Sequence, residues 1–158
     1  MHYHVRRARA GVKTDKNFML KVVKLSGFML QWASDALKAD KKLVLEALNN
    51  GNCHDTPLRF AASELQADKE VVLKAVNYDG QSIRFASDEL KADKEVVVEA
   101  LANSCFALKH ASQNLRKKGV LYDYLNGLLS IYDTPVYVFL STVLFASKLK
   151  YERDEPSS

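Results

Sequence analysis

Residues 85–97 read FASDELKADKEVV, and residues 60–72 carry a close copy, FAASELQADKEVV. A phrase that recurs at a fixed interval is typical of repeat architectures, in which each copy builds one supersecondary unit. When the comparison is extended along the chain, four copies align, and they begin at Asp15, Asp40, Asp68 and Asp93. Successive copies start 25, 28 and 25 residues apart, and the longer second copy has its extra residues in a turn.

Each copy predicts two helical segments separated by a turn. The first segment begins at the aspartate, whose carboxylate can accept the free backbone N–H groups of a helix start. Apolar residues follow at i, i+1, i+4 and i+5, as in VVLKAV at residues 71–76, and these positions share one helical face. The second segment has an apolar stripe with alanine at its centre, as at Ile83, Ala86 and Leu90. Such a stripe lets neighbouring segments pack closely.

Helices of about ten residues are marginal alone in water, so neighbouring copies must stabilise one another by stacking. We therefore expect an all-α fold, an α-solenoid-like stack of short helical hairpins with repeats of about 25 residues. Serine at positions 34, 87 and 112 leaves two interpretations of the second segment, because serine favours caps over helix interiors. The segment is either one continuous helix or a short turn followed by a second short helix.

The domain organisation follows from these copies. We expect a basic N-terminal arm at residues 1–14, four repeats within residues 15–118, a divergent fifth or capping hairpin at 119–150 and a polar tail at 151–158. The four repeats span residues 15–39, 40–67, 68–92 and 93–117. The fifth hairpin is indicated by DTPVYVFLSTVLFASKL at 133–149, which partly repeats DTPLRFAASEL at 55–65.

The alternation of DKEVVL-type and L-x-x-A-S-x-x-L-type phrases resembles the helical repeat family catalogued as domain of unknown function 4116. The motif DKEVVLKAV followed by IRFASDELKAD carries this resemblance, which covers residues 15–118. The resemblance implies an array of short helices and implies nothing about catalysis, because the family has no assigned activity or site. The chain departs from the pattern at His110, where the other copies have Trp or Phe, and after residue 119.

Charge is distributed unevenly along the 158 residues. The formal net charge is +4, and the four cations of the N-terminal arm supply all of it, since the remaining 19 Lys and Arg balance 19 Asp and Glu. Nucleic-acid binding would therefore depend on the arm, because affinity for phosphate scales with the cations that displace counterions. The longest apolar stretch, residues 135–146, is shorter than the ~20 residues that cross a bilayer, so no membrane span is expected.

Two cysteines are too few for a disulfide framework, which predicts an intracellular, reducing compartment. The cytoplasm is the first expectation. The arginine-rich start, which contains no acid, also fits the end of an organellar transit peptide.

A cation recurs at one position of three copies, and the arm adds three arginines. These residues form a candidate ladder for a phosphate backbone or an acidic peptide: Arg6, Arg7, Arg9, Arg59, Arg84 and Lys109. The alternative is a solvated face on which Arg84 pairs with Asp88 one helical turn on.

An aromatic position lies next to these cations, and it is occupied by Trp32, Phe60, Phe85 and His110. We expect these side chains to pack in the core; the alternative is a platform that stacks bases. Residues 53–55 (CHD) are three potential metal ligands in one turn. A structural zinc site needs about four ligands, and no second pair lies nearby, so we expect no metal and no cofactor.

Five of the seven tyrosines lie after residue 119, among leucines and phenylalanines. Tyrosine is enriched at protein interfaces, so this segment is interpreted as a partner surface; the alternative is that it packs only on the fourth repeat. The expected partner-binding residues are Tyr132, Tyr137, Phe139, Leu140 and Leu144.

Carboxylates recur at capping positions in every copy, which indicates a structural role rather than a single active site. We therefore expect no enzyme, but a non-enzymatic helical-repeat scaffold for protein–protein interaction, a small structural subunit of a larger assembly. The alternative function is nucleic-acid binding through the arm and the cation ladder.

Overall fold

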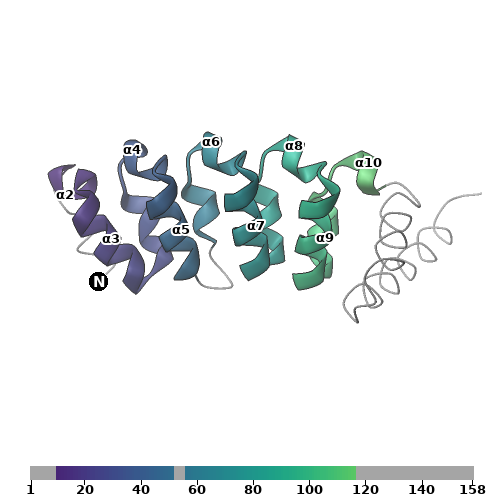
Figure 1. The fold of residues 1–158 in the computed structure, drawn as a ribbon, viewed down its shortest axis with the longest axis horizontal. Coiled ribbons are helices and arrows are strands. Elements are labelled where there is room, and N and C mark those ends of the chain that lie inside the picture. The colour runs from purple at the N-terminus through teal and green to yellow at the C-terminus, as the bar shows by residue number, and fades with distance from the viewer. Residues whose placement is uncertain (1–9, 52–55, 117–158) are drawn as a thin grey trace, which may run out of the picture.

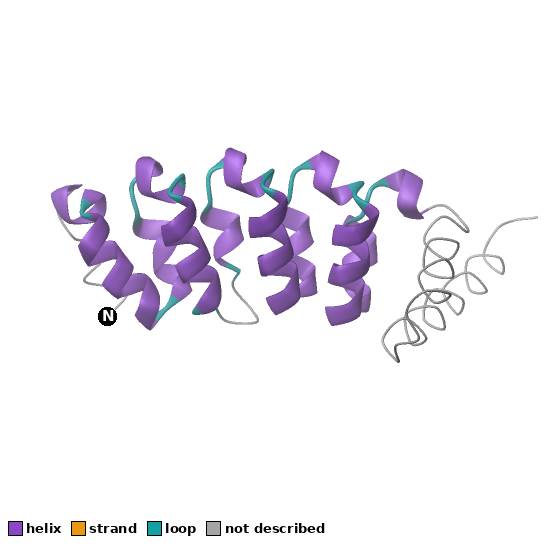
Figure 2. Cartoon of the chain, in the orientation of Figure 1, coloured by secondary structure: helices purple, strands orange, loops and turns teal. Residues whose placement is uncertain are grey.

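The computed structural model describes residues 10–51 and 56–116 of the chain. Within these residues every regular element is an α-helix or a 3₁₀-helix (η), and there is no strand (Figure 2). The prediction of an all-α fold is confirmed. The predicted fifth hairpin and the polar tail lie outside the described residues.

The elements recur in one order: a long α-helix, a 3₁₀-helix and a short α-helix, which together are called a unit below. The long helices are α3 (Lys16–Leu25), α5 (Lys41–Asn49), α7 (Lys69–Tyr78) and α9 (Lys94–Asn103). The 3₁₀-helices are η1 (Gly27–Trp32), η2 (Pro57–Phe60), η3 (Gly80–Phe85) and η4 (Cys105–His110). The short helices are α4 (Asp35–Lys38), α6 (Ser63–Gln66), α8 (Asp88–Lys91) and α10 (Gln113–Arg116).

The described units lie side by side in chain order (Figure 1). The long helices form one row, the η elements form a second row behind it, and the short helices line one edge. Each long helix contacts the next long helix, and each η element contacts the next η element. Every unit is therefore packed on its neighbours along two rows.

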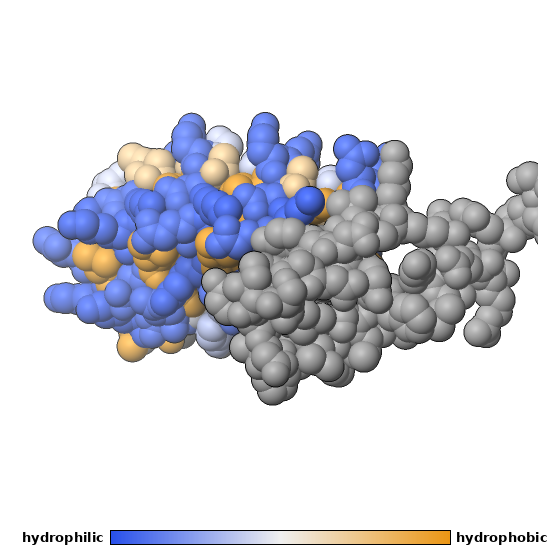
Figure 3. Space-filling view, turned by 45° about the vertical axis from the view of Figure 1, so that its right-hand side comes forward, coloured by the Kyte–Doolittle hydropathy of each residue, from blue (hydrophilic) through white to orange (hydrophobic). Residues whose placement is uncertain are grey.

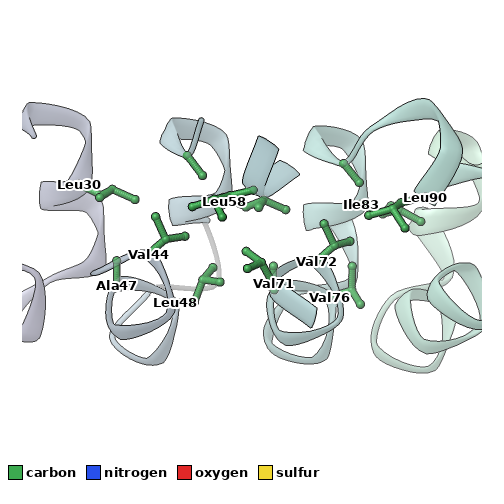
Figure 4. Close-up of a cluster of buried hydrophobic side chains, with 14 of the residues drawn as sticks. Leu30, Val44, Ala47, Leu48, Leu58, Val71, Val72, Val76, Ile83 and Leu90 are labelled. Carbon is green, nitrogen blue, oxygen red and sulfur yellow. The ribbon is translucent and has the colours of Figure 1, made fainter. Parts of the chain in front are cut away.

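The core lies between these two rows. Residues that the repeat pattern predicts as stacking residues are almost fully buried; Val71, Val72 and Ile83, for example, have 0% exposure. Figure 4 shows the side chains of Val44, Leu58 and these three residues along one band that runs from unit to unit. Burying one such side chain stabilises the fold by about 1.5–3 kcal/mol, so this band supplies most of the stability.

The second helical segment of each copy is broken. The 3₁₀-helix ends at an alanine in extended conformation, and the next residue, also extended, begins the short α-helix, as at Ala86 (ψ 160°) and Ser87 (ψ 161°). The interpretation as one continuous helix is wrong, and the alternative with a second short helix is confirmed. The serine hydroxyl is not the common cause, because Ser34 makes no side-chain cap and the second copy has Ala62 at this position.

A backbone hydrogen bond to the preceding unit explains the break. The N–H of Ser87 donates to the carbonyl oxygen of Gln66 at the end of α6, with an N···O distance of 2.9 Å, and the N–H of Ala62 donates to that of Lys38 at 3.0 Å. An N–H that bonds across units cannot bond within its own helix, so the chain is extended here. The same bond joins Ser34 to Lys13 and Ser112 to Lys91.

Residues at the end of the predicted arm belong to this arrangement. They form α2 (Ala10–Thr14), whose Lys13 carbonyl accepts the N–H of Ser34 at 3.0 Å, as the last residues of α4, α6 and α8 do for the next unit. The signal in the sequence is KTDK at residues 13–16, which matches KADK at 38–41 and 91–94. The arm arginines at positions 6, 7 and 9 lie outside the described residues.

Two glycines allow the backbones of neighbouring units to touch. A Cβ atom on Gly80 would lie 2.1 Å from the carbonyl oxygen of Ala100 in α9, and one on Gly27 would lie 2.0 Å from that of Ala47 in α5. In both cases the obstacle is helix backbone, which cannot turn aside as a flexible side chain can. Glycine is therefore required where an η element meets the next long helix.

Gly80→Ala is expected to lower the free energy of unfolding by about 2 kcal/mol or more, because η3 must move away from α9 to relieve the clash. Urea unfolding followed by circular dichroism measures this change. Gly11→Ala is the matched control: its Cβ would meet nothing within 4 Å, and alanine in α2 is expected to be neutral or stabilising by up to about 1 kcal/mol. Equal stability of the two variants would contradict the close approach.

Candidate functional site

The aspartates that begin α5, α7 and α9 use their two carboxylate oxygens differently. In Asp68, Oδ1 accepts the backbone N–H groups of Glu70 and Val71 at 3.0 and 3.2 Å, which caps α7. Oδ2 of the same side chain lies 2.7 Å from Nζ of Lys41, at the start of the preceding long helix. One side chain therefore starts its own helix and links it to the previous unit.

The same link joins the other adjacent units in the described part of the chain. Nζ of Lys69 lies 2.7 Å from Oδ2 of Asp93, and Lys16 contacts Asp40. A second carboxylate from the next helix, such as that of Glu95, lies 2.8 Å from the same lysine nitrogen. In the second and third copies the Asp-Lys pair therefore makes links in two directions: the aspartate binds the preceding unit and the lysine binds the following one.

These links shift the pKa of the groups that form them. The hydrogen bond from Lys41 lowers the pKa of Asp68, although desolvation acts to raise it, and Lys16 lowers the pKa of Asp40 in the same way. Hydrogen bonds to its two carboxylate partners raise the pKa of Lys69. The shifts of Asp40, Asp68 and Lys69 all favour the charged form of the group.

The three recurring cations Arg59, Arg84 and Lys109, called the cation row below, lie on η2, η3 and η4. All three residues are exposed. No ion pair involves any of them within residues 10–51 and 56–116. The structure therefore places these cations at one position of successive units, with their charge uncompensated by a nearby carboxylate of the described chain.

The predicted pair between Arg84 and Asp88 is wrong. Asp88 lies in α8, beyond the break in the second segment, so the two residues are not one helical turn apart. Its carboxylate contacts Lys91 at 3.3 Å, within the same short helix. The guanidinium carbon of Arg84 lies instead 4.6 Å from the ring centroid of Phe85, a distance typical of a cation–π contact.

The aromatic residues beside the cation row are partly buried and pack against the core, as expected for Trp32, Phe60 and Phe85. Each ring also has a cation over it: Arg59 lies 5.7 Å from the Phe60 centroid and Lys13 lies 6.0 Å from that of Trp32. Rings covered on one side by cations and packed on the core do not offer free faces to bases. Sequence reasoning missed Lys13 here, because it assigned the residue to the arm.

His110 ends the aromatic series and is half-buried. Burial lowers the pKa of this imidazole, and the positive charges of Lys109, Arg84 and Lys91 lower it further. Its Nε2 atom is buried and makes no hydrogen bond in the described part of the protein. The cations near this imidazole come from two neighbouring units, Lys109 from its own and Arg84 and Lys91 from the preceding one.

Other predicted site residues lie outside the described residues, including the turn at 53–55. These are Arg6, Arg7, Arg9, Tyr132, Tyr137, Phe139, Leu140 and Leu144. Among the residues that are described, no three His, Cys, Asp or Glu side chains are grouped to hold a metal ion. None of the described helices is both long and apolar enough to cross a membrane.

Comparison with known proteins identifies one family. The family model described as Domain of unknown function (DUF4116) matches the chain twice, over residues 15–66 and over residues 68–116. Each match takes in two units, and the resemblance found in the repeated motifs is confirmed. No curated protein and no solved structure matches the chain.

Two substitutions of Asp68 can distinguish the contribution of its helix cap from that of its ion pair with Lys41. Asp68→Ala is expected to lower the free energy of unfolding by about 1–2 kcal/mol, because it removes both the cap and the ion pair. Asp68→Asn retains a capping oxygen and loses only the charge, so a loss of about 0.5 kcal/mol is expected. Urea unfolding of both variants measures these losses. Equal losses would show that the side chain does not cap α7.

The lowered pKa values predict how stability depends on pH. A carboxyl whose pKa is lower in the folded state than its usual 3.8 stabilises the fold above that pH, and this contribution disappears as the pH falls through the lowered value. The stability difference between wild type and Asp68→Asn should therefore be constant from pH 7 to about pH 5 and shrink as the pH falls below 3.8 through the lowered pKa. Urea unfolding across this range tests it; a difference that grows on acidification would refute the link.

Proposed function

We propose that this chain, which belongs to the DUF4116 family, is a non-enzymatic helical-repeat scaffold for protein–protein interaction. We propose further that its units form an α-solenoid, that residues 119–150 add a fifth or capping hairpin, and that the protein is a small structural subunit of a larger assembly. A repeat stack suits this role because it presents an extended, rigid surface.

The observation that carries this proposal is the linkage between units. Neighbouring units are joined by the buried band, by the backbone bond such as Ser87 N–H to Gln66, and by the link between Lys41 and Asp68. The recurring carboxylates are occupied by caps and links, so their repetition has a structural cause. Equivalent surface positions are consequently held at regular intervals, as a partner that spans several units requires.

The apolar contact of this scaffold is proposed to lie after the described units. The face seen in Figure 3 is mostly hydrophilic where it is described, with only small apolar areas between charged residues. Isolated exposed apolar side chains such as Leu25, at 65% exposure, do not form a docking surface by themselves. The predicted contact residues are therefore kept as those of the C-terminal segment: Tyr132, Tyr137, Phe139, Leu140 and Leu144.

Nucleic-acid binding is the second candidate, and the uncompensated cation row favours it. The covered aromatic rings weigh against it, because a single strand would find cations but few stacking faces. Three cations on the described units would also give low affinity, since phosphate binding grows with the number of ion contacts.

Affinity capture of the tagged full chain from an extract of its own cells tests the proposal, with and without nuclease and with co-purifying chains identified by mass spectrometry. We expect a protein partner that survives nuclease and is lost from the Leu140→Asp, Leu144→Asp double variant. Leu25→Asp, which alters an exposed leucine of α3, is the control that should retain the partner. Capture that nuclease abolishes would instead support the nucleic-acid candidate.

A further inference from the structure

The η elements differ in charge from the rest of the described chain. Their sequences, GFMLQW, PLRF, GQSIRF and CFALKH, contain no Asp or Glu, and the cation row supplies every full charge on them at neutral pH. Lys74 of α7 also makes no ion pair with another residue that the structure describes, but glutamates such as Glu70 lie on the same helix. The row of η elements is therefore the one described row with positive charge alone.

Each arginine of the cation row lies over an aromatic ring. The guanidinium carbon of Arg84 lies 4.6 Å from the ring centroid of Phe85 and that of Arg59 lies 5.7 Å from the centroid of Phe60, and both rings pack against the core. A guanidinium in contact with a ring still has N–H donors for a carboxylate, which it can bind with two hydrogen bonds in a planar fork. Ordering this side chain in the free protein reduces the entropy lost on binding.

The electrostatic environment agrees with this geometry. His110 is influenced by Lys109 of its own unit and by Arg84 and Lys91 of the preceding unit, all of which lower its pKa in addition to burial. Cations on neighbouring units are thus close enough to act together. With no acid on the η elements, an anion from outside the described chain is the natural complement of this row.

The interval between successive cations of the row indicates how the negative charges of a ligand should be spaced. Packed helices lie about 8–10 Å apart, so equivalent cations of successive units recur at about that interval. A peptide in the polyproline II conformation has three residues per turn and advances about 3.1 Å per residue, so every third side chain returns to the same face after about 9 Å. Carboxylates at every third residue of such a peptide would therefore meet one cation in each unit.

We propose that the cation row binds an acidic peptide segment of a partner protein in the polyproline II conformation, with Asp or Glu at every third residue. Arg59 and Arg84 each bind one carboxylate through the guanidinium edge, and Lys109 binds the third through its ammonium group. This assignment rests on the proposed scaffold function and names the chemistry of one partner segment. The proposed peptide site is separate from the C-terminal apolar contact, so an experiment can refute one of the two surfaces without refuting the other.

Fluorescence anisotropy with the full chain at low salt tests the proposal, using an unstructured fluorescent peptide that has three glutamates, one at every third residue. We expect it to bind, and Arg84→Gln and Lys109→Gln each to weaken binding by about tenfold. The matched control Lys74→Gln removes an exposed cation from α7 and should leave affinity unchanged. A thermal melt confirms that the variants are folded.

Two further probes decide between ligands. A peptide of the same composition with its three glutamates adjacent should bind several-fold more weakly, because it can engage only one unit at a time. Equal affinity for the two peptides, or equal effects of Lys74→Gln and Arg84→Gln, would overturn the assignment. A thymidine oligonucleotide that binds as tightly as the spaced peptide would also overturn it, in favour of nucleic acid. Nuclease-resistant capture of a protein partner alongside such a result would leave the scaffold function standing.

Discussion

At the starts of α5, α7 and α9, the aspartate carboxylate both caps its own helix and binds a lysine of the preceding unit, and the arrangement of neighbouring units depends on this double use. Asp68 caps α7 with one oxygen and binds Lys41 of the preceding unit with the other. A cap contributes about 1 kcal/mol and an exposed ion pair at most about 1 kcal/mol, far less than the buried band. The carboxylate therefore sets the register between units, whereas apolar packing supplies most of the stability.

The sequence predicted those features of the fold whose physical cause lies within a single helix. Aspartate caps and the apolar face of residues 71–76 depend on the helix that contains them, so the long helices and the all-α class were predictable. The break in the second segment was left open, because its cause is an N–H that bonds to another unit. Ala62 illustrates this: alanine favours helix interiors, yet its N–H bonds to Lys38 and the chain is extended there.

The candidate site shows the same division between local and non-local causes. The recurrence of Arg59, Arg84 and Lys109 was evident from alignment of the copies, and their exposure was expected. The pair of Arg84 with Asp88 was predicted from helical spacing, which the break removes. The contact between the Lys13 ammonium and the Trp32 ring could have been found by extending the alignment to the KTDK sequence at the start of the first unit. Sequence repetition thus identified which residues share a position, but not what each of them contacts.

Amide hydrogen exchange measured by NMR can test whether hydrogen bonds between units hold the stack together. The N–H groups of Ala62, Ser87 and Ser112 lie in extended connections, where a stack without such bonds would leave them open to water. We expect them to exchange as slowly as core amides of the long helices, such as that of Val72. Exchange at the rate of an unstructured chain, while Val72 stays protected, would contradict it.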